Sequence, residues 1–241
     1  MIHKPAFNKA FRYFLFFLGI YIISLGIAFA TRSGLGTLPL SSLPYSLSMG
    51  LPLSMGTFMM MLNLACFLGQ LLLLRKQFPK PWLLQIPAAF VFGWMTDFSN
   101  WLLAGLEPSN YFMRLGCVAL GIVIVALGLS IEVCANTIML SVDGFVKAIV
   151  MSKGTNFGKT KVCLDITLVS LSIISSLILL HNIQGVREGT VLAALLVGTL
   201  SRIFTPRISK LIPMPREAVE ITLPKHSAES DMESTQEEEV I

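Results

Sequence analysis

Long apolar runs constrain the fold of this chain more strongly than any other feature of its sequence. Several windows of about 20 residues carry almost no charge, and a helix of that length crosses a bilayer core of roughly 30 Å. Hydrophobic residues make up 54% of the chain and charged residues 13%, whereas soluble domains carry about 25% charged residues. The sequence therefore predicts an all-α, polytopic integral membrane protein.

About six helices are expected to cross the membrane, and the first of them raises the question of a cleaved signal peptide. Ala28-Phe29-Ala30 resembles a cleavage site, and basic residues precede the apolar run. That run is longer than the core of about 7–15 residues in a signal peptide, so we expect the helix to be retained. The expected spans are residues 11–31, 55–74, 82–104, 112–133, 161–180 and 189–204.

Lysines and arginines are unevenly distributed over the connections between these spans. With a cytoplasmic N-terminus, most of them lie in cytoplasmic loops, and the external side keeps Arg32, Arg114 and Arg187. This asymmetry satisfies the positive-inside rule and predicts that both termini are cytoplasmic. The predicted organisation is a cytoplasmic N-terminus at 1–10, a first membrane half at 11–104, an external loop at 105–111, a second membrane half at 112–210 and an acidic, disordered cytoplasmic tail at 211–241.

The two membrane halves share a sparse internal repeat at an offset of about 100 residues. In this repeat Asn63 falls opposite Asp165. The matching segments are 25–26 with 127–128, 36–41 with 136–141, and 54–57 with 156–159. Because each half contains an odd number of spans, the repeat predicts two halves with inverted topology, an architecture that recurs among secondary transporters.

Two segments rich in glycine, proline and serine, at 34–50 and 136–151, interrupt the apolar pattern. The inverted repeat places one of them on each side of the membrane. Each segment either dips into the membrane as a re-entrant element or lies on its surface as an interfacial helix. Irregular backbone at membrane depth needs protein or water around it to satisfy its amide groups. A surface loop with an amphipathic turn is the alternative.

Charged residues in or beside membrane spans are costly and are candidate functional sites. The repeat sets Arg32 opposite Glu132 and Asp97 opposite Arg202. We expect Arg32 to pair with Asp97 near the external side, and Glu132 to pair with Arg202 near the cytoplasmic side. These pairs either fasten each half together or act as gates around a central site.

A solute or coupling ion is expected to bind between the halves, close to the interrupted segments. Asp165 is the candidate coupling acid, because no basic residue matches it in the repeat. The structural alternative for Asp165 is a pair with Lys161, one helical turn before it. The candidate binding residues are Asn63, Asp165, Thr37, Thr137 and Asn136.

Motifs for enzyme chemistry are absent from the sequence, including a phosphate-binding P-loop, His-Glu-x-x-His and Gly-x-Ser-x-Gly. The cysteines lack the paired spacing of a metal site. We therefore expect no enzymatic activity, no cofactor, no metal site and no nucleic-acid partner. The expected partners are the lipid bilayer and a small solute. Small residues such as Gly116, Gly121 and Gly128 pack helices either within one chain or in a homo-oligomer.

Three segments resemble the bacterial YczE/YyaS/YitT family of integral membrane proteins. They are LGIAFATRSGLGTLP at 25–39, GLPLSMGT at 50–57 and GVREGTVLAALLVG at 185–198. The similarity covers about residues 10–210 and implies a multi-pass protein of the bacterial cytoplasmic membrane. At Thr37-Leu38-Pro39 the chain departs from the more polar Ser/Thr-Pro-x-Asp-like turn expected of the family.

Together these features predict a small secondary transporter or exporter of an unidentified solute, driven by a proton or cation gradient. The alternative is a membrane protein that does not transport but recruits or stabilises a partner complex. Two changes separate these hypotheses. A transporter should keep its activity when the tail after about Lys225 is removed, and it should lose activity when Asp165 is replaced by asparagine.

Overall fold

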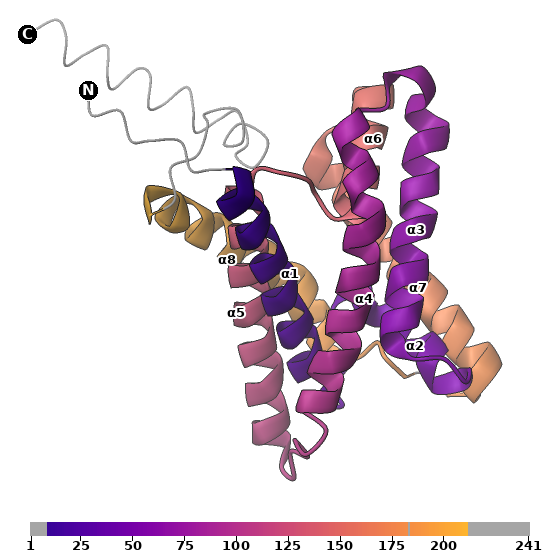
Figure 1. The fold of residues 1–241 in the computed structure, drawn as a ribbon. Helices are drawn as coiled ribbons and strands as arrows, with labels where there is room; N and C mark the ends of the chain where they lie inside the picture. Colours follow the sequence, from indigo (N-terminus) through magenta and orange to yellow (C-terminus); the bar gives the residue numbers. More distant parts are fainter. Residues whose placement is uncertain (1–8, 183, 212–241) are drawn as a thin grey trace, which may run out of the picture.

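The computed structural model describes residues 9–182 and 184–211, and this part of the chain is helical with no strand (Figure 1). The expectations for the segments at 1–8 and 212–241, including the acidic tail, lie outside the described residues. The α-helices are α1 (Lys9–Arg32), α2 (Pro39–Gly50), α3 (Met55–Leu74), α4 (Gln85–Leu102), α5 (Tyr111–Ala135), α6 (Ser141–Lys153), α7 (Phe157–Leu180) and α8 (Glu188–Leu211). Two short 3-10 helices, η1 (Arg75–Gln77) and η2 (Lys80–Leu84), precede α4.

Among the described residues, five helices are long and apolar enough to cross a membrane: α1, α3, α5, α7 and α8. Their length and composition are those of membrane-spanning helices. The expected span at 82–104 instead begins as the 3-10 turn η2 and continues as α4, which is not among the five. Pro81 and Pro87 account for the late start of α4, because proline cannot donate a backbone hydrogen bond and fits only the first turn of a helix. Polar residues such as Gln85, Asp97 and Asn100 lower the hydropathy of α4 below that of the five spans.

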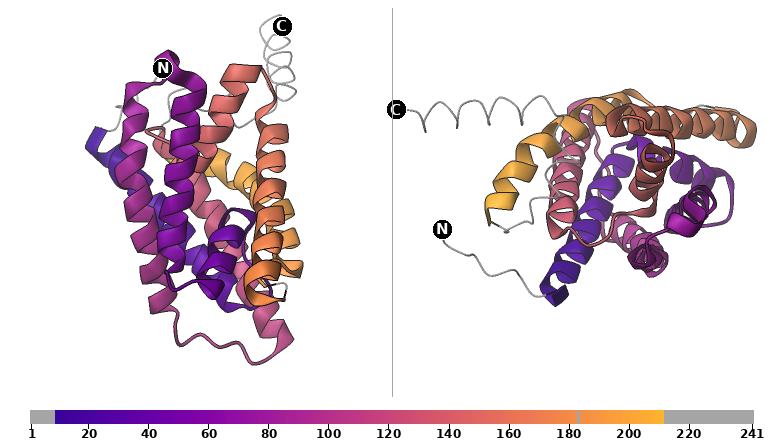
Figure 2. Two further views of the ribbon diagram at one scale, coloured as in Figure 1. Left: turned by 90° about the vertical axis from the view of Figure 1, so that its right-hand side faces the viewer. Right: turned by 90° about the horizontal axis from the view of Figure 1, so that it is seen from above.

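The two interrupted segments form α2 and α6, which lie at opposite ends of the helix bundle (Figures 1 and 2). Each is a helix with a buried side rather than a surface loop. Pro39 starts α2, and its buried serines satisfy their hydroxyls on backbone carbonyls one turn earlier. Asn136 and Gly154, both with positive φ, end α5 and α6 in the left-handed conformation of helix C-caps.

The centre of the bundle is the contact between α1 and α5, which is the most extensive in the described chain. Gly26 and Gly121 face each other so closely that an added Cβ at Gly26 would lie 2.8 Å from the carbonyl oxygen of Gly121. At Gly128 it would lie 2.9 Å from the carbonyl oxygen of Gly19. Gly121 and Gly128 therefore pack helices within one chain, whereas Gly116 has no atom within 4 Å of its position for a Cβ. Such close approach of backbones is typical of helix packing in membranes.

The remaining helices pack partly on this pair and partly on one another. α4 contacts α1 and α3, while α8 contacts α5. α2 packs against α7, and α6 packs against α3. Many large apolar side chains on α7 and α8 are exposed, among them Ile166, Ile178, Val191 and Leu195. This apolar outer surface is suited to contact with lipid.

Candidate functional site

The break between α5 and α6 brings together buried polar groups from four helices. α5 ends at Ala135, and residues 136–140 lead into α6 at Ser141. Arg12 of α1 donates to the carbonyl oxygens of Ala135 (2.9 Å) and Asn136, so the last carbonyls of α5 are held by a cation. This interaction is favourable because the C-terminal end of a helix carries partial negative charge.

Glu132 lies one turn before the end of α5 and is 5% exposed. Its Oε1 accepts a hydrogen bond from the backbone N–H of Leu140 (2.9 Å), so the carboxyl lies at the N-terminus of α6. A helix N-terminus stabilises negative charge there. Its Oε2 is buried and has no hydrogen-bond partner among the described residues.

Two glutamines approach the same turn from α3 and α4. The Nε2 of Gln70 donates to the Oε1 of Gln85 and to the carbonyl oxygen of Ser141, both at 2.8 Å. Both glutamines are buried. Gln70 Oε1 and Gln85 Nε2 remain without partners in the described chain, as do the hydroxyls of Ser141 and Thr137. Buried polar atoms are nearly always hydrogen-bonded, so this concentration of unpaired ones marks a candidate binding site.

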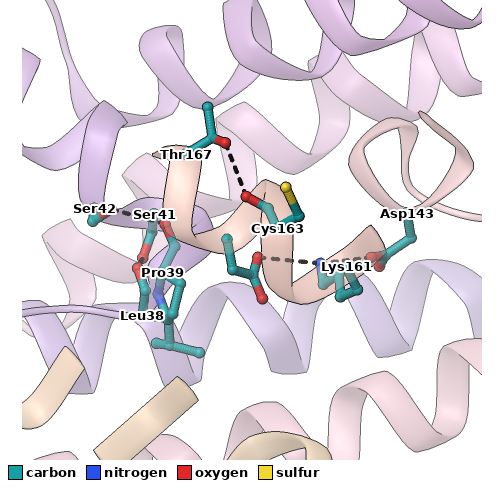
Figure 3. A network of polar contacts seen from close by, with 9 residues as sticks. Leu38, Pro39, Ser41, Ser42, Asp143, Lys161, Cys163 and Thr167 are labelled. Carbon is teal, nitrogen blue, oxygen red and sulfur yellow. Dashed lines mark hydrogen bonds and ion pairs between the residues drawn. The ribbon is translucent and has the colours of Figure 1, made fainter. Parts of the chain in front are cut away.

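Charged residues of α6 and α7 lie next to this turn. Figure 3 shows Lys161 of α7 reaching Asp143 of α6, with 2.7 Å between Nζ and Oδ1. Lys161 also lies 3.7 Å from Oδ1 of Asp165, one turn further along α7, so the structural alternative for Asp165 is present. Glu132 interacts electrostatically with both Asp143 and Lys161. Two carboxyl groups, those of Asp143 and Asp165, therefore share a single lysine.

Lys147 of α6 takes no part in these ion pairs. Its ammonium group lies 5.7 Å from the centre of the Trp82 ring, a cation–π contact. Burial lowers the pKa of Lys147, because the charged form loses hydration.

The five predicted binding residues are divided between the two ends of the bundle. Asn63 is fully buried on α3, and its Oδ1 is unpaired in the described chain. It lies two turns from Gln70 on the same side of the helix. Thr37 lies at the α2 end, where its hydroxyl bonds that of Ser41 at 2.7 Å. The structure thus places Thr137 and Asn136 at the Glu132 turn and separates Thr37 from them.

The two predicted charge pairs are not brought together. Arg32 donates to the backbone carbonyl of Asn100 at 2.7 Å. Asp97 accepts from the hydroxyl of Ser54 (2.5 Å) and from the backbone N–H of Gly56 (2.7 Å), at the N-terminus of α3. Arg202 is exposed on α8. Among the described residues, the recorded ion pairs involve none of the four charged residues that we expected to pair.

A pocket of about 260 Å³ opens at the opposite, α2 end of the bundle. Its lining consists of Thr31, Arg32, Tyr45, Ser48, Met55 and Asn100. Burial raises the pKa of Tyr45, and the positive charge of Arg32 acts in the opposite direction.

The sequence did not indicate Tyr45, Gln70 or Gln85 as candidate site residues, because the candidates were the charged groups in the spans and only some residues of the interrupted segments. The sequence signal for the two glutamines is an uncharged amide side chain within or beside an apolar helix.

Metal binding by several acids finds no support in the described chain, since no group of three or more His, Cys, Asp or Glu side chains lies close enough to hold an ion. The described cysteines, Cys66, Cys117, Cys134 and Cys163, are free.

Comparison with known proteins places the chain in a family. Residues 10–206 match DUF6198, a family of unknown function. The chain belongs to this family. It is also 27% identical over 202 residues to the uncharacterized protein YyaS of Bacillus subtilis (strain 168), an alignment that covers 83% of this chain and 94% of that protein. The resemblance to the YyaS family predicted from the sequence is confirmed. No solved structure matches the chain.

Proposed function

We propose that this DUF6198 member is a small secondary transporter built from two inverted halves. The observation that carries the proposal is an exchange of contacts at the α1–α5 interface. Gly19 and Gly26 are repeated about 100 residues later as Gly121 and Gly128. Gly19 contacts Gly128, and Gly26 contacts Gly121. Swapping the halves therefore converts one contact into the other, as a twofold axis in the membrane plane requires.

Exchange of the two halves also relates the contacts of the short helices α2 and α6 with the long helices α7 and α3. In the first half, Gln70 of α3 donates to the carbonyl of Ser141 in α6 at 2.8 Å. In the second half, Ser172 of α7 donates to the carbonyl of Ser42 in α2 at 2.8 Å. Each long helix thus holds the short helix of the other half. This arrangement supports two related units that meet around the centre of the molecule.

A six-span topology follows if α4 crosses the membrane as the counterpart of α8. Its 18 residues extend for about 27 Å, close to the thickness of the hydrocarbon core. Six crossings place both ends of the chain on one side, and the distribution of basic residues supports a cytoplasmic location for that side. The α2 end then faces outward and the α6 end faces the cytoplasm.

The pocket beside Arg32 is the proposed external entrance for a solute. Arg32 forms no ion pair with a described residue, and the pocket also offers the hydroxyls of Tyr45 and Ser48. A guanidinium group with free donors binds carboxylate and phosphate groups well. The pocket therefore favours a small solute that carries a negatively charged group, and no enzymatic step is needed.

Flux measurements in proteoliposomes test this function. We expect the full chain to accelerate uptake of at least one member of a panel of small carboxylates and phosphate esters. Arg32→Gln should reduce that uptake by about ten- to a hundredfold, because a charged hydrogen bond contributes roughly 1.5–3 kcal/mol. Arg114→Gln is the matched control, since Arg114 lies at the same end but does not line the pocket.

The outcome that contradicts transport is uptake no faster than in protein-free liposomes for every solute. Removal of the residues after Lys225 should leave uptake unchanged. A tail deletion that abolishes function in cells while flux persists in liposomes would instead indicate a separate recruiting role for the tail.

A further inference from the structure

We infer that the turn between α5 and α6 binds a small monovalent cation, either a proton or Na⁺, with Glu132 as its charged ligand. The inference deepens the proposed transport function by naming the coupling ion class and the residue that holds it. Binding itself does not depend on transport and is measured separately.

The first argument is the environment of the Glu132 carboxyl. One oxygen is used by the backbone N–H of Leu140, and the other is buried without a partner in the described chain. An unpaired buried carboxylate oxygen is costly in a membrane protein. A proton on Oε2 or a cation beside it removes that cost.

The second argument is the supply of neighbouring oxygens. The hydroxyls of Thr137 and Ser141 are also buried and unpaired among the described residues. Thr137 lies within the connection that the Glu132–Leu140 hydrogen bond closes, and Ser141 directly follows Leu140. Oxygen ligands of this kind suit hard cations, and interrupted helices are where secondary transporters bind coupling ions.

The third argument is that Glu132 forms no ion pair with a basic side chain among the described residues. Arg12 of α1 is committed to the carbonyls of Ala135 and Asn136. Lys161 of α7 is committed to Asp143 of α6 and to Asp165. On α3, the neighbour Gln70 is uncharged, and α8 presents Thr205 to α5 while its Arg202 is exposed.

These contacts favour a monovalent over a divalent ion, and they favour Glu132 over Asp165 as the acid that binds it. A divalent ion usually takes several charged or imidazole ligands, and the described chain has no group of three or more His, Cys, Asp or Glu side chains that could hold one. Asp165, which the sequence favoured, also has a buried Oδ1 without a hydrogen bond in the described chain, but this oxygen lies 3.7 Å from the ammonium group of Lys161, so Asp165 is a weaker candidate than Glu132. One carboxylate with two hydroxyls matches a single positive charge.

Thermal unfolding of the purified full chain in lipid nanodiscs tests whether the site binds Na⁺. Replacing choline chloride by NaCl at equal ionic strength should raise the unfolding midpoint, and the increase should shrink as pH falls because protons compete for the same carboxyl. Glu132→Gln should abolish the increase, whereas Glu107→Gln, an exposed acid in the loop after α4, should retain it.

Infrared difference spectroscopy tests whether the site binds a proton. If the site takes protons only, NaCl has no effect, but the carbonyl band of a protonated carboxyl is present at neutral pH and disappears in Glu132→Gln. If that variant does not fold, Thr137→Val and Ser141→Ala replace it, and each should weaken the apparent affinity for Na⁺ about tenfold or shift the carboxyl band.

The inference is overturned if wild-type protein shows neither a Na⁺ effect nor a protonated carboxyl band, or if both are unchanged in the Glu132, Thr137 and Ser141 variants. Failure of the transport proposal is distinguishable. In that case cation binding is measured as described, yet no solute of the panel crosses proteoliposomes.

Discussion

Asp97 and Glu132 each lie beside the first turn of a helix from another part of the chain. Asp97 accepts the N–H of Gly56 in α3, and Glu132 accepts the N–H of Leu140 at the start of α6. Backbone N–H groups at a helix start have no partner within their own helix. They also carry partial positive charge. A carboxylate beside them is therefore stabilised electrostatically without an arginine partner.

Substitution of Asp97 measures the strength of this arrangement. Asp97→Ala should destabilise the protein by about 0.5–2 kcal/mol, the range for removal of a helix-capping side chain. Asp97→Asn should cost less, because the amide oxygen still accepts from Gly56. Chemical unfolding in detergent provides the measurement. Equal stability of wild type and Asp97→Ala would show that the cap contributes nothing.

Contacts between α6 and the pair α3–α4 depend on a single glycine. A Cβ on Gly144 would lie 2.7 Å from Nε2 of Gln85 and 2.8 Å from Oε1 of Gln70. The two amides therefore close over the backbone of α6, and the hydrogen bond from Gln70 to Ser141 fixes the start of that helix. The polar wall of the candidate site is built by this packing.

Gly144→Ala should therefore destabilise the protein by about 0.5–1.5 kcal/mol, because the two glutamine amides must move away from the added methyl group and the hydrogen bond from Gln70 to Ser141 is lost. Gly116→Ala is the matched control, because a Cβ there meets no atom within 4 Å. That control should be neutral or slightly stabilising, since alanine is the better helix former by up to about 1 kcal/mol. Unfolding midpoints of the two variants compare them directly, and indistinguishable midpoints would contradict the packing argument.

The whole molecule places its two short helices at opposite ends of one bundle (Figure 1). α2 is held by α7 of the second half, and α6 is held by α3 of the first half. Because each half stabilises the short helix of the other, neither half is expected to form a complete site alone. The Arg32 pocket and the Glu132 turn are thus separate regions of one molecule.

Cysteine labelling from the two sides of the membrane tests this arrangement in the bilayer. In a background without native cysteines, Met49→Cys in α2 should react only from outside, and Met151→Cys in α6 only from the cytoplasm. Both positions are exposed, at 42% and 52%. Labelling of both from the same side would rule out inverted halves.

Helix positions were predictable where the apolar pattern is complete. The expected span at 55–74 coincides with α3, and Ser54 caps it as its side chain accepts from Thr57. The expected start at 161 was too late for α7, which begins at Phe157 after the cap Asn156. Its first turn is polar, so hydropathy alone missed it.

The sequence by itself determined the membrane class, the long helices, the two interruptions and the family, because hydrophobicity and backbone propensity act locally along the chain. Only the tertiary structure decided the partners of the charged residues. Glu132 meets Leu140 rather than Arg202, and Asp97 meets Gly56 rather than Arg32. Which charges interact depends on how close folding brings them, and spacing along the chain carries no information about backbone donors presented by another helix.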